Sequence, residues 1–256
     1  MLAVTQLAGF GIGAGSDGPA SMVFNNTDEY LTKTITTSGA STNRFTFSFW
    51  IKTATLADED GIFYSTNSAH TNAVSIAFQD MSGAKFSIVT DVGGSVSYWN
   101  TGDTNLLAID NTWQHFVLVF DSPQATAANR ILMWKNGAVI ADSTFVGQEP
   151  QNAASNMFVS GNIWYLGNNP VFANFNTKKL AFIDLLQGTI AAPTDFAFNN
   201  GGVWTRKPFA GTRGPYGFAL TGLGGLGVDL AGGMNFTPVN MDASNLDFGD
   251  LPPFIL

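Results

Sequence analysis

The sequence predicts an all-β protein in which two antiparallel sheets pack face to face. Many short segments rich in Thr, aromatic and β-branched residues are separated by Gly and Asn turns. No stretch shows the sustained 3.6-residue periodicity of an amphipathic helix. The chain has 256 residues, close to the roughly 200–250 residues that one β-sandwich domain can reach.

Residues 44–52 and 113–121 are the two clearest strands. The first alternates apolar and polar residues, and its apolar side chains share one face, namely Phe45, Phe47, Phe49 and Ile51. The second is apolar on both faces, as expected of a central strand in a two-layer sandwich. We expect its core residues to be Phe116, Leu118 and Phe120.

Turn signals delimit the other strands. Two strands are expected in residues 72–90, around Met81-Ser82-Gly83, and another after Val92-Gly93-Gly94. Asn136-Gly137 predicts a type I′ hairpin, because that turn needs a positive φ at both central residues. Further strands are expected at residues 163–167 and 179–186, with one helical turn at 193–196.

Both ends of the chain differ from its middle in composition. Residues 1–20 form a Gly-rich arm, residues 21–200 the sandwich, and residues 201–256 an extended Gly/Pro-rich tail. The first segment has no Lys or Arg before its apolar stretch, which argues against a signal peptide. Fixing such segments costs conformational entropy, so contacts must order them. Those contacts come from the chain's own sandwich, a neighbouring copy, or a different protein.

The composition excludes several classes of protein. No Cys is present, so disulfides and cysteine-ligated metals are excluded. The net charge of −8 argues against a nucleic-acid partner, and no apolar run reaches the roughly 18 residues of a membrane span. Only 12% of residues are charged, against about 25% in ordinary domains. This scarcity predicts a surface partly covered by other subunits, and we expect a homo-oligomer, specifically a trimer.

The sequence lacks the residue patterns of an enzyme. A retaining glucanase needs two carboxylates about 5–5.5 Å apart, and no Glu-x-Asp-x-Glu run is present. Asp58-Glu59-Asp60 is expected to be a solvated turn. The two histidines, His70 and His115, are too few for a confident metal site, and His115 is expected to be a satisfied core or interface residue. We therefore expect no catalysis.

Two kinds of binding site remain as candidates. Four aromatic residues could stack on sugar rings, namely Trp99, Trp134, Trp164 and Tyr165. For each, the alternative is packing in the core or between subunits. Calcium is the only metal considered, with Asp58, Asp60 and Asp121 as weak candidate ligands. Their alternative role is that of solubilising loop carboxylates, and no other cofactor is expected.

Several motifs resemble those of a known family. Trp113-Gln114-His115-Phe116-Val117, followed by Lys135-Asn136-Gly137, resembles the central motif of laminin-G-like (concanavalin A-like) domains. Tyr30-Leu31 with residues 44–52 resembles the opening of bacteriophage structural proteins, and residues 180–196 resemble a later segment of them. The resemblance covers residues 21–252, and the order of the motifs makes it more specific than any one of them.

The resemblance implies a jelly-roll domain in a bacteriophage virion protein. We expect a non-enzymatic structural protein at the virion surface, such as a capsid decoration, head-fibre or tail-appendage component contacting other virion proteins. The alternative is a carbohydrate-binding receptor module that contacts host surface glycans. The sequence departs from the family's pattern at one point. The family usually has an acidic residue before this strand, whereas this chain reads Lys178-Lys179-Leu180-Ala181. No role of that carboxylate is carried over.

Overall fold

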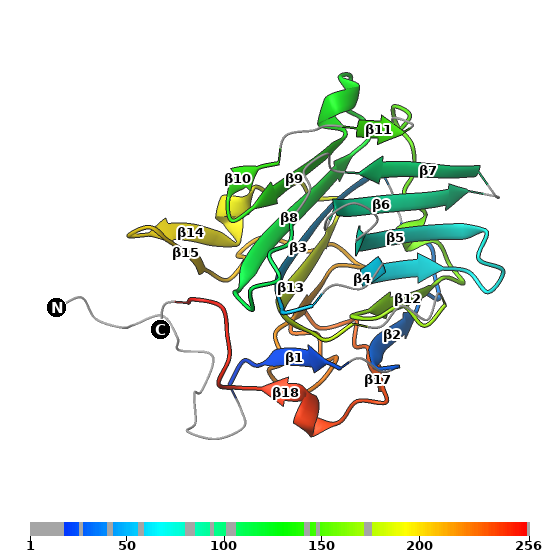
Figure 1. The fold of residues 1–256 in the computed structure, drawn as a ribbon. Helices are drawn as coiled ribbons and strands as arrows, with labels where there is room; N and C mark the ends of the chain where they lie inside the picture. Colours follow the sequence, from blue (N-terminus) through cyan, green and yellow to red (C-terminus); the bar gives the residue numbers. More distant parts are fainter. Residues whose placement is uncertain are drawn as a thin grey trace.

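The protein folds into two eight-stranded antiparallel sheets packed face to face, which confirms the predicted fold class (Figure 1). The computed structural model describes residues 18–25, 28–39, 43–55, 59–79, 85–92, 95–100, 106–140, 144–146, 149–171 and 176–254. The predicted N-terminal arm therefore lies outside the described residues up to position 17. None of the helical segments in these ranges could span a membrane.

Each sheet combines strands from distant parts of the chain. Sheet A has the order β10 (Ala138–Val139), β9 (Ile131–Lys135), β8 (Gln114–Asp121), β3 (Arg44–Thr53), β13 (Lys178–Gln187), β1 (Ser21–Phe24) and β18 (Leu246–Asp247), and β16 (Phe218–Leu220) also pairs with β13. Sheet B has the order β11 (Thr144–Val146), β7 (Ser95–Asn100), β6 (Lys85–Val92), β5 (Asn72–Gln79), β4 (Glu59–Thr66), β12 (Ile163–Leu166), β2 (Tyr30–Thr34) and β17 (Thr237–Val239).

Short helical turns and one separate hairpin complete the fold. The hairpin consists of β14 (Ala197–Asn200) and β15 (Val203–Arg206). The 3-10 turns are η1 (Ala127–Asn129), η2 (Asn156–Phe158), η3 (Pro193–Asp195) and η4 (Ala243–Asn245). The turn expected at residues 193–196 is thus present.

The core lies between the two sheets and is built from alternating aromatic residues. All six side chains predicted from β3 and β8 are buried, namely Phe45, Phe47, Phe49, Phe116, Leu118 and Phe120. Phe45 lies opposite Phe120 in the register, and their rings stack with centroids 5.2 Å apart. Burial of such side chains stabilises the fold by roughly 1.5–3 kcal/mol each.

The predicted hairpin between β9 and β10 is confirmed. Asn136 and Gly137 both have positive φ, 47° and 81°, as a type I′ turn requires. Asn136 also accepts a hydrogen bond through its side-chain oxygen from the His115 backbone N–H (2.8 Å). The turn residue therefore also fixes β9 against β8.

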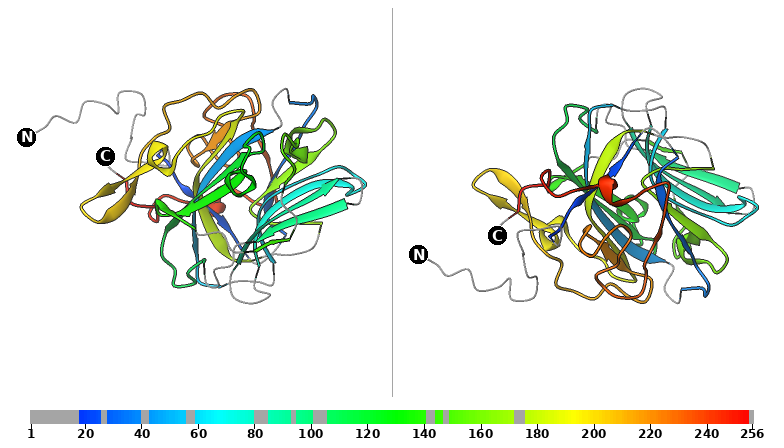
Figure 2. Two further views of the ribbon diagram at one scale, coloured as in Figure 1. Left: turned by 90° about the horizontal axis from the view of Figure 1, so that it is seen from above. Right: turned by 90° about the horizontal axis from the view of Figure 1, so that it is seen from below.

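Sheet A carries a third layer on the face away from sheet B, where β14, β15 and the C-terminal segment lie (Figure 2). Two apolar clusters fill this interface. One contains Trp50, Ala181, Phe182 and Ala197, and the other contains Val117, Leu186, Ala191 and Phe196. The apolar residues on both faces of β8 are explained by this layer, because the strand is covered on both sides.

The C-terminal region belongs to the sandwich of its own chain. Strand β17 pairs with β2, and β18 pairs with β1. Four side chains of this region are in the main core, namely Phe218, Leu220, Met234 and Phe236. The carboxylate of Asp229 organises a turn by accepting four backbone N–H groups, from Ala219, Ala231, Gly233 and Met234. Of the three sources of ordering contacts considered for the Gly/Pro-rich tail, these contacts come from the chain's own sandwich.

Candidate functional site: a tyrosine row on sheet B

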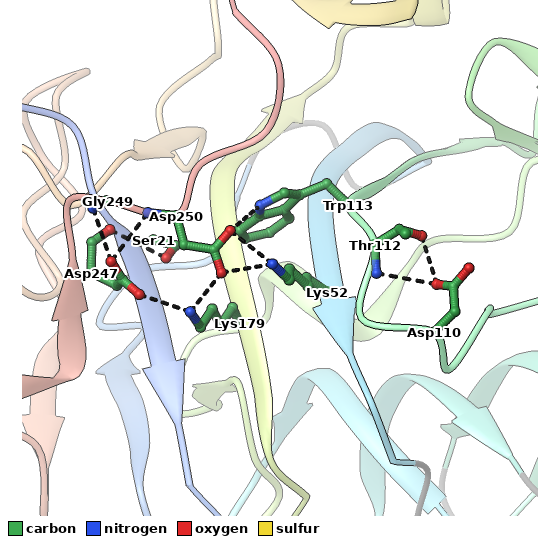
Figure 3. A network of polar contacts seen from close by, with 9 residues as sticks. All are labelled: Ser21, Lys52, Asp110, Thr112, Trp113, Lys179, Asp247, Gly249 and Asp250. Atoms are coloured by element: carbon green, nitrogen blue, oxygen red, sulfur yellow. Dashed lines mark hydrogen bonds and ion pairs between the residues drawn. The ribbon is translucent and has the colours of Figure 1, made fainter.

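The outer face of sheet A is closed by the chain itself. The Asp250 carboxylate anchors the C-terminal segment there by accepting hydrogen bonds from Lys52 Nζ (2.8 Å), Lys179 Nζ (2.6 Å) and Trp113 Nε1 (2.9 Å) (Figure 3). Burial opposes ionisation of Asp250, but these hydrogen bonds outweigh it and lower the pKa to about 2. Any ligand site on this face must therefore lie outside the area that the segment covers.

The same network brings two carboxylates together without creating an acid–base pair. Asp247 and Asp250 both contact Lys179 Nζ, at 2.7 and 2.6 Å. A glycosidase needs one carboxyl group with a raised pKa to act as the acid. The Lys179 hydrogen bond lowers the pKa of Asp247, and the pKa of Asp250 is lowered as well. Neither group can hold a proton near neutral pH.

His115 and Ser48 are 2.9 Å apart, yet they do not form a catalytic dyad. Trp204 Nε1–H donates a hydrogen bond to His115 Nδ1 (2.9 Å), so the imidazole proton must be on Nε2, facing Ser48 Oγ. The ring therefore cannot accept the serine proton, as a base in a catalytic triad does. Burial lowers the pKa of His115 to about 3, and its ring stacks on Trp50. The expectation of a satisfied buried histidine is confirmed.

Asp60 is buried at the start of β4, so its predicted position in a solvated turn is wrong. Its two carboxylate oxygens accept hydrogen bonds from Lys178 Nζ and from Asn176 Nδ2 (2.9 Å). Lys178 Nζ also donates to Asn168 Oδ1 (2.9 Å), and both members of the ion pair are fully buried. Burial lowers the pKa of Lys178, and Asp60 opposes that effect. The ammonium thus occupies the place that a cation would need.

The candidate calcium ligands do not form one site. Asp121 accepts hydrogen bonds from Arg44 Nε (2.7 Å) and Gln124 Nε2 (2.6 Å). It lies opposite Arg44 at the first residue of β3, whereas Lys178, the partner of Asp60, lies opposite Thr53 at the last. Asp58 lies outside the described residues, and within them no three His, Asp or Glu side chains are placed to hold a metal.

Three tyrosines lie together on the outer face of sheet B, and we call them the tyrosine row. Tyr165 lies opposite Tyr64 in the register and diagonal to Tyr30, while its neighbours Trp164 and Leu166 are in the core. The rings of Tyr30 and Tyr165 meet edge to face with centroids 5.6 Å apart, and Tyr64 stacks behind Tyr165 at 6.3 Å.

Polar groups surround the half-exposed part of the tyrosine row. Thr32 lies directly opposite Tyr165, and the exposed Thr237 lies opposite Thr32. Among the described residues nothing hydrogen-bonds to the hydroxyls of Tyr30 and Tyr165. Burial, together with Tyr30, raises the pKa of Tyr165, which keeps its hydroxyl protonated. Tyr30 and Tyr165 therefore offer ring faces and free hydroxyls, without a charged side chain between them.

The other predicted aromatic residues have different positions. Trp164 is fully buried, and its Nε1–H donates to the Met157 carbonyl (2.7 Å), so a sugar ring cannot stack on it. Trp134 is half-buried at the edge of sheet A, packed against the cluster that contains Val117 and Phe196. Trp99 lies on β7 opposite Ile88. The structure brings none of these three to the tyrosine row.

A sequence profile of the Concanavalin A-like lectin/glucanases superfamily matches residues 25–179. The chain belongs to this superfamily. The matched residues include seven of the eight strands of sheet B, four of the eight strands of sheet A and all three tyrosines of the row. No curated protein matches the sequence.

Solved structures share the fold of this superfamily member only distantly. A Bacteroides ovatus protein, proposed there to bind carbohydrate, is 15% identical with a TM-score of 0.49, covering 92% of this chain and 62% of that one. A heptameric pentraxin from Limulus polyphemus is 13% identical with a TM-score of 0.45, and the match covers 70% of this chain and 80% of the pentraxin chain. The NanB sialidase of Streptococcus pneumoniae is 17% identical with a TM-score of 0.45, and the match covers 67% of this chain but only 26% of the sialidase chain.

Sequence reasoning found Tyr165 but missed Tyr30 and Tyr64. The sequence did contain a signal for both. Tyr30 directly precedes the core residue Leu31, and Tyr64 directly follows the core residue Phe63. Because side chains alternate between the two faces of a strand, both tyrosines must face outward. Strand alternation gives the face of a residue but not its neighbours. The row exists because β12 pairs with both β2 and β4, which lie about 130 and 100 residues before it along the chain.

Proposed function

We propose that this superfamily member is a non-catalytic carbohydrate-binding module, and that the tyrosine row is its binding site. The observation that carries the proposal is the pair of half-exposed rings, Tyr30 and Tyr165, with hydroxyls that no described group engages. An aromatic face is electronegative and attracts the weakly positive C–H groups of a sugar, while free hydroxyls hydrogen-bond its oxygens.

The position of the row supports this proposal. Tyr30 and Tyr165 lie on β2 and β12, toward the β17 edge of sheet B, and both keep part of their surface exposed, whereas Tyr64 on the next strand, β4, is only 3% exposed. The uncharged chemistry of Tyr30, Tyr165, Thr32 and Thr237 suits a neutral, hydroxyl-rich glycan. The lowered pKa values of Asp247 and Asp250 favour binding without hydrolysis.

The experiment compares two aromatic residues on opposite sides of the sandwich. The purified chain is screened on neutral glycans, and the best ligand is then titrated against Tyr165→Ala and Trp134→Ala. We expect Tyr165→Ala to weaken binding by about tenfold or more, as loss of a buried aromatic anchor does. Trp134→Ala and EDTA should leave the affinity unchanged, and the chain should release no sugar.

Loss of binding in Trp134→Ala alone would move the site to the edge of sheet A. Binding that neither variant changes would exclude both surfaces. Glycan hydrolysis that disappears with an Asp or Glu substitution would overturn the non-catalytic assignment.

A second candidate, a structural protein at the surface of a bacteriophage virion, is supported by the order of the sequence motifs and by the 12% charge content. Copies arranged as a homo-oligomer, a trimer in our proposal, would present several tyrosine rows at once and raise avidity. Quantifying the protein in purified particles tests this role, since decoration needs many copies per particle and an appendage only a few. Absence from the particles, or a monomer in light scattering, would contradict it.

A further inference from the structure

Arg206, the last residue of β15, carries a guanidinium group without a partner. Its Cζ lies 3.8 Å from the centroid of the Phe182 ring, and its Nε is buried with no hydrogen bond. Among the described residues no group accepts a hydrogen bond from its other guanidinium nitrogens. The backbone N–H of Arg206 bonds to the Pro253 carbonyl (2.8 Å), so the strand is fixed while the side-chain donors are free.

The ring beneath Arg206 is positioned by an irregular backbone. Phe182 has a φ of +47°, rare for an aromatic residue, at the point where the register of β13 against β3 shifts between Ala181 and Asp184. As a result, Ala181 and Phe182 both lie in the cluster on the outer face of sheet A. A strained residue that persists in a fold is often part of a functional site.

The charges around Arg206 do not balance. Arg213 forms an ion pair with Asp184. Its Nε and Nη2 atoms lie 2.8 and 2.7 Å from Oδ1 of the Asp184 carboxylate. These three residues therefore carry one net positive charge. The nearby Asp229 carboxylate also acts on Asp184, but it is stabilised by four backbone N–H groups and is not hydrogen-bonded to Arg206. Burial lowers the pKa of Arg206 to about 10, and Asp184 opposes this, so the group stays a cation at neutral pH. A partly buried cation without a counterion is unfavourable and is stabilised by a bound anion.

We propose that Arg206 binds the carboxylate of a ligand, on the side of the molecule opposite the tyrosine row. A guanidinium fork matches the two oxygens of a carboxylate, and stacking on Phe182 holds its plane. The single unbalanced charge matches a carboxylate better than a phosphate monoester, which carries about −1.5 to −2. Arg206 is partly exposed, so the free donors can be reached from solvent.

The site is independent of the proposed sugar platform. Arg206 lies on β15 in the third layer and Phe182 lies on the outer face of sheet A, whereas the tyrosine row is on the far face of sheet B. A neutral glycan that binds at the row gains nothing from Arg206. Failure of either assignment therefore leaves the other standing.

The test follows the Nε–H resonance of Arg206 by NMR in the full chain at pH 7 and constant ionic strength. Acetate, glucuronate, glucose and inorganic phosphate are added in separate titrations, with chloride as the reference anion. We expect a saturable shift with acetate and glucuronate and none with glucose. Tighter binding of glucuronate than of acetate would assign an acidic sugar as the source of the carboxylate, and equal binding would assign the carboxylate alone.

Variants distinguish a specific contact from general charge. Binding to the variants is followed through the backbone amide resonance of residue 206. Arg206→Gln should weaken acetate binding by about tenfold or more, and Arg206→Lys should weaken it too, because an ammonium lacks the fork. The matched control is Lys207→Gln, which removes an exposed charge at the next position and should bind as the original chain does. The Trp204 Nε1–H resonance reports that the hairpin is still folded, through its bond to His115.

The proposal is overturned if neither carboxylate gives a saturable shift in the unmodified chain. It is equally overturned if phosphate alone binds, or if Lys207→Gln loses as much affinity as Arg206→Gln. The titration of the unmodified chain decides the matter even if Arg206→Gln does not fold.

Discussion

At the scale of single residues, three buried polar groups are held by specific partners, and for two of them these partners are side chains far away in the chain. His115 is fixed by Trp204 and Ser48, Asp60 by Lys178, and Asp229 by backbone N–H groups. Each would be costly without its partner, because a buried polar group has lost its water. Their roles are structural, and removing any one of them should destabilise the fold.

His115 makes stability depend on pH. Its pKa is about 3 in the folded chain and about 6.5 when unfolded, so between these values the unfolded state binds more protons. The stabilisation that depends on neutral His115 is fully present above pH 6.5. Below that pH the free energy of unfolding falls, by up to about 1.4 kcal/mol for each pH unit down to about 3. Urea unfolding between pH 6.5 and 5 measures this slope.

The dependence of the free energy of unfolding on pH should become weaker in His115→Gln. The control is His70→Asn, at the other, exposed histidine, which should keep the same pH dependence. A slope that His115→Gln leaves intact would show that another group titrates.

The adjacent lysines of β13 should respond very differently to the same substitution. Lys178→Met leaves the fully buried Asp60 without a counterion, which costs about 3–5 kcal/mol. Lys179→Met breaks ion pairs with the partly exposed Asp247 and Asp250 and should cost about 1 kcal/mol or less. Urea unfolding compares the two.

Replacing both members, in Asp60→Leu with Lys178→Met, should recover most of the loss. Equal effects of the two single lysine variants would contradict the buried pair.

At the scale of elements, the C-terminal segment acts as a strap on sheet A. Its anchor is Asp250, and the bond from Arg206 N–H to the Pro253 carbonyl lies beyond it along the chain. Strap and hairpin together cover one face of β3, β8 and β13 with the third layer. On sheet B, by contrast, Tyr30 and Tyr165 keep part of their surface exposed on the outer face.

Asp250→Asn should loosen this strap without unfolding the sandwich. The variant removes the charge that binds Lys52 and Lys179, so the amide of Arg206 should exchange its hydrogen faster. Hydrogen exchange by NMR measures this, with Asp110→Asn as the control, since that exposed carboxylate bonds only within its own turn, to Thr112 (Figure 3).

The pH dependence of the strap has a definite sign. The pKa of Asp250 is depressed, so the strap holds at neutral pH and is lost as the pH falls from about 4 through 2. An unchanged exchange rate at Arg206 in Asp250→Asn would remove Asp250 as the anchor.

At the scale of the whole molecule, the sandwich needs its C-terminal region. Strands β16, β17 and β18 come from that region, and Phe218, Leu220 and Phe236 are in the main core. A fragment ending at Asn200 should therefore fail to fold, shown by the loss of a cooperative thermal transition. If that fragment did fold, the predicted boundary between the sandwich (residues 21–200) and the C-terminal tail would be supported.

Removal of residues 1–17 should have the opposite outcome. Strand β1 begins at Ser21, and the N–H of the buried Ala20 bonds to the Thr221 carbonyl (2.9 Å), so the described contacts remain intact. We expect the melting temperature to be unchanged and oligomer assembly to be weakened, measured by calorimetry and light scattering. Full assembly of the shortened chain would show that this arm makes no contacts between subunits.

The sequence by itself determined the fold class, most strands, the Asn136-Gly137 turn and the core of β3 and β8. These depend on alternation and turn chemistry within a few residues, which are visible in the sequence. Only the tertiary structure decided that Asp60 is buried against Lys178, that Trp164 is in the core while Tyr165 faces out beside Tyr30, and that Arg206 is without a partner. The physical reason is that burial, pairing and charge balance depend on contacts between strands distant in sequence, and local patterns do not specify which strands meet.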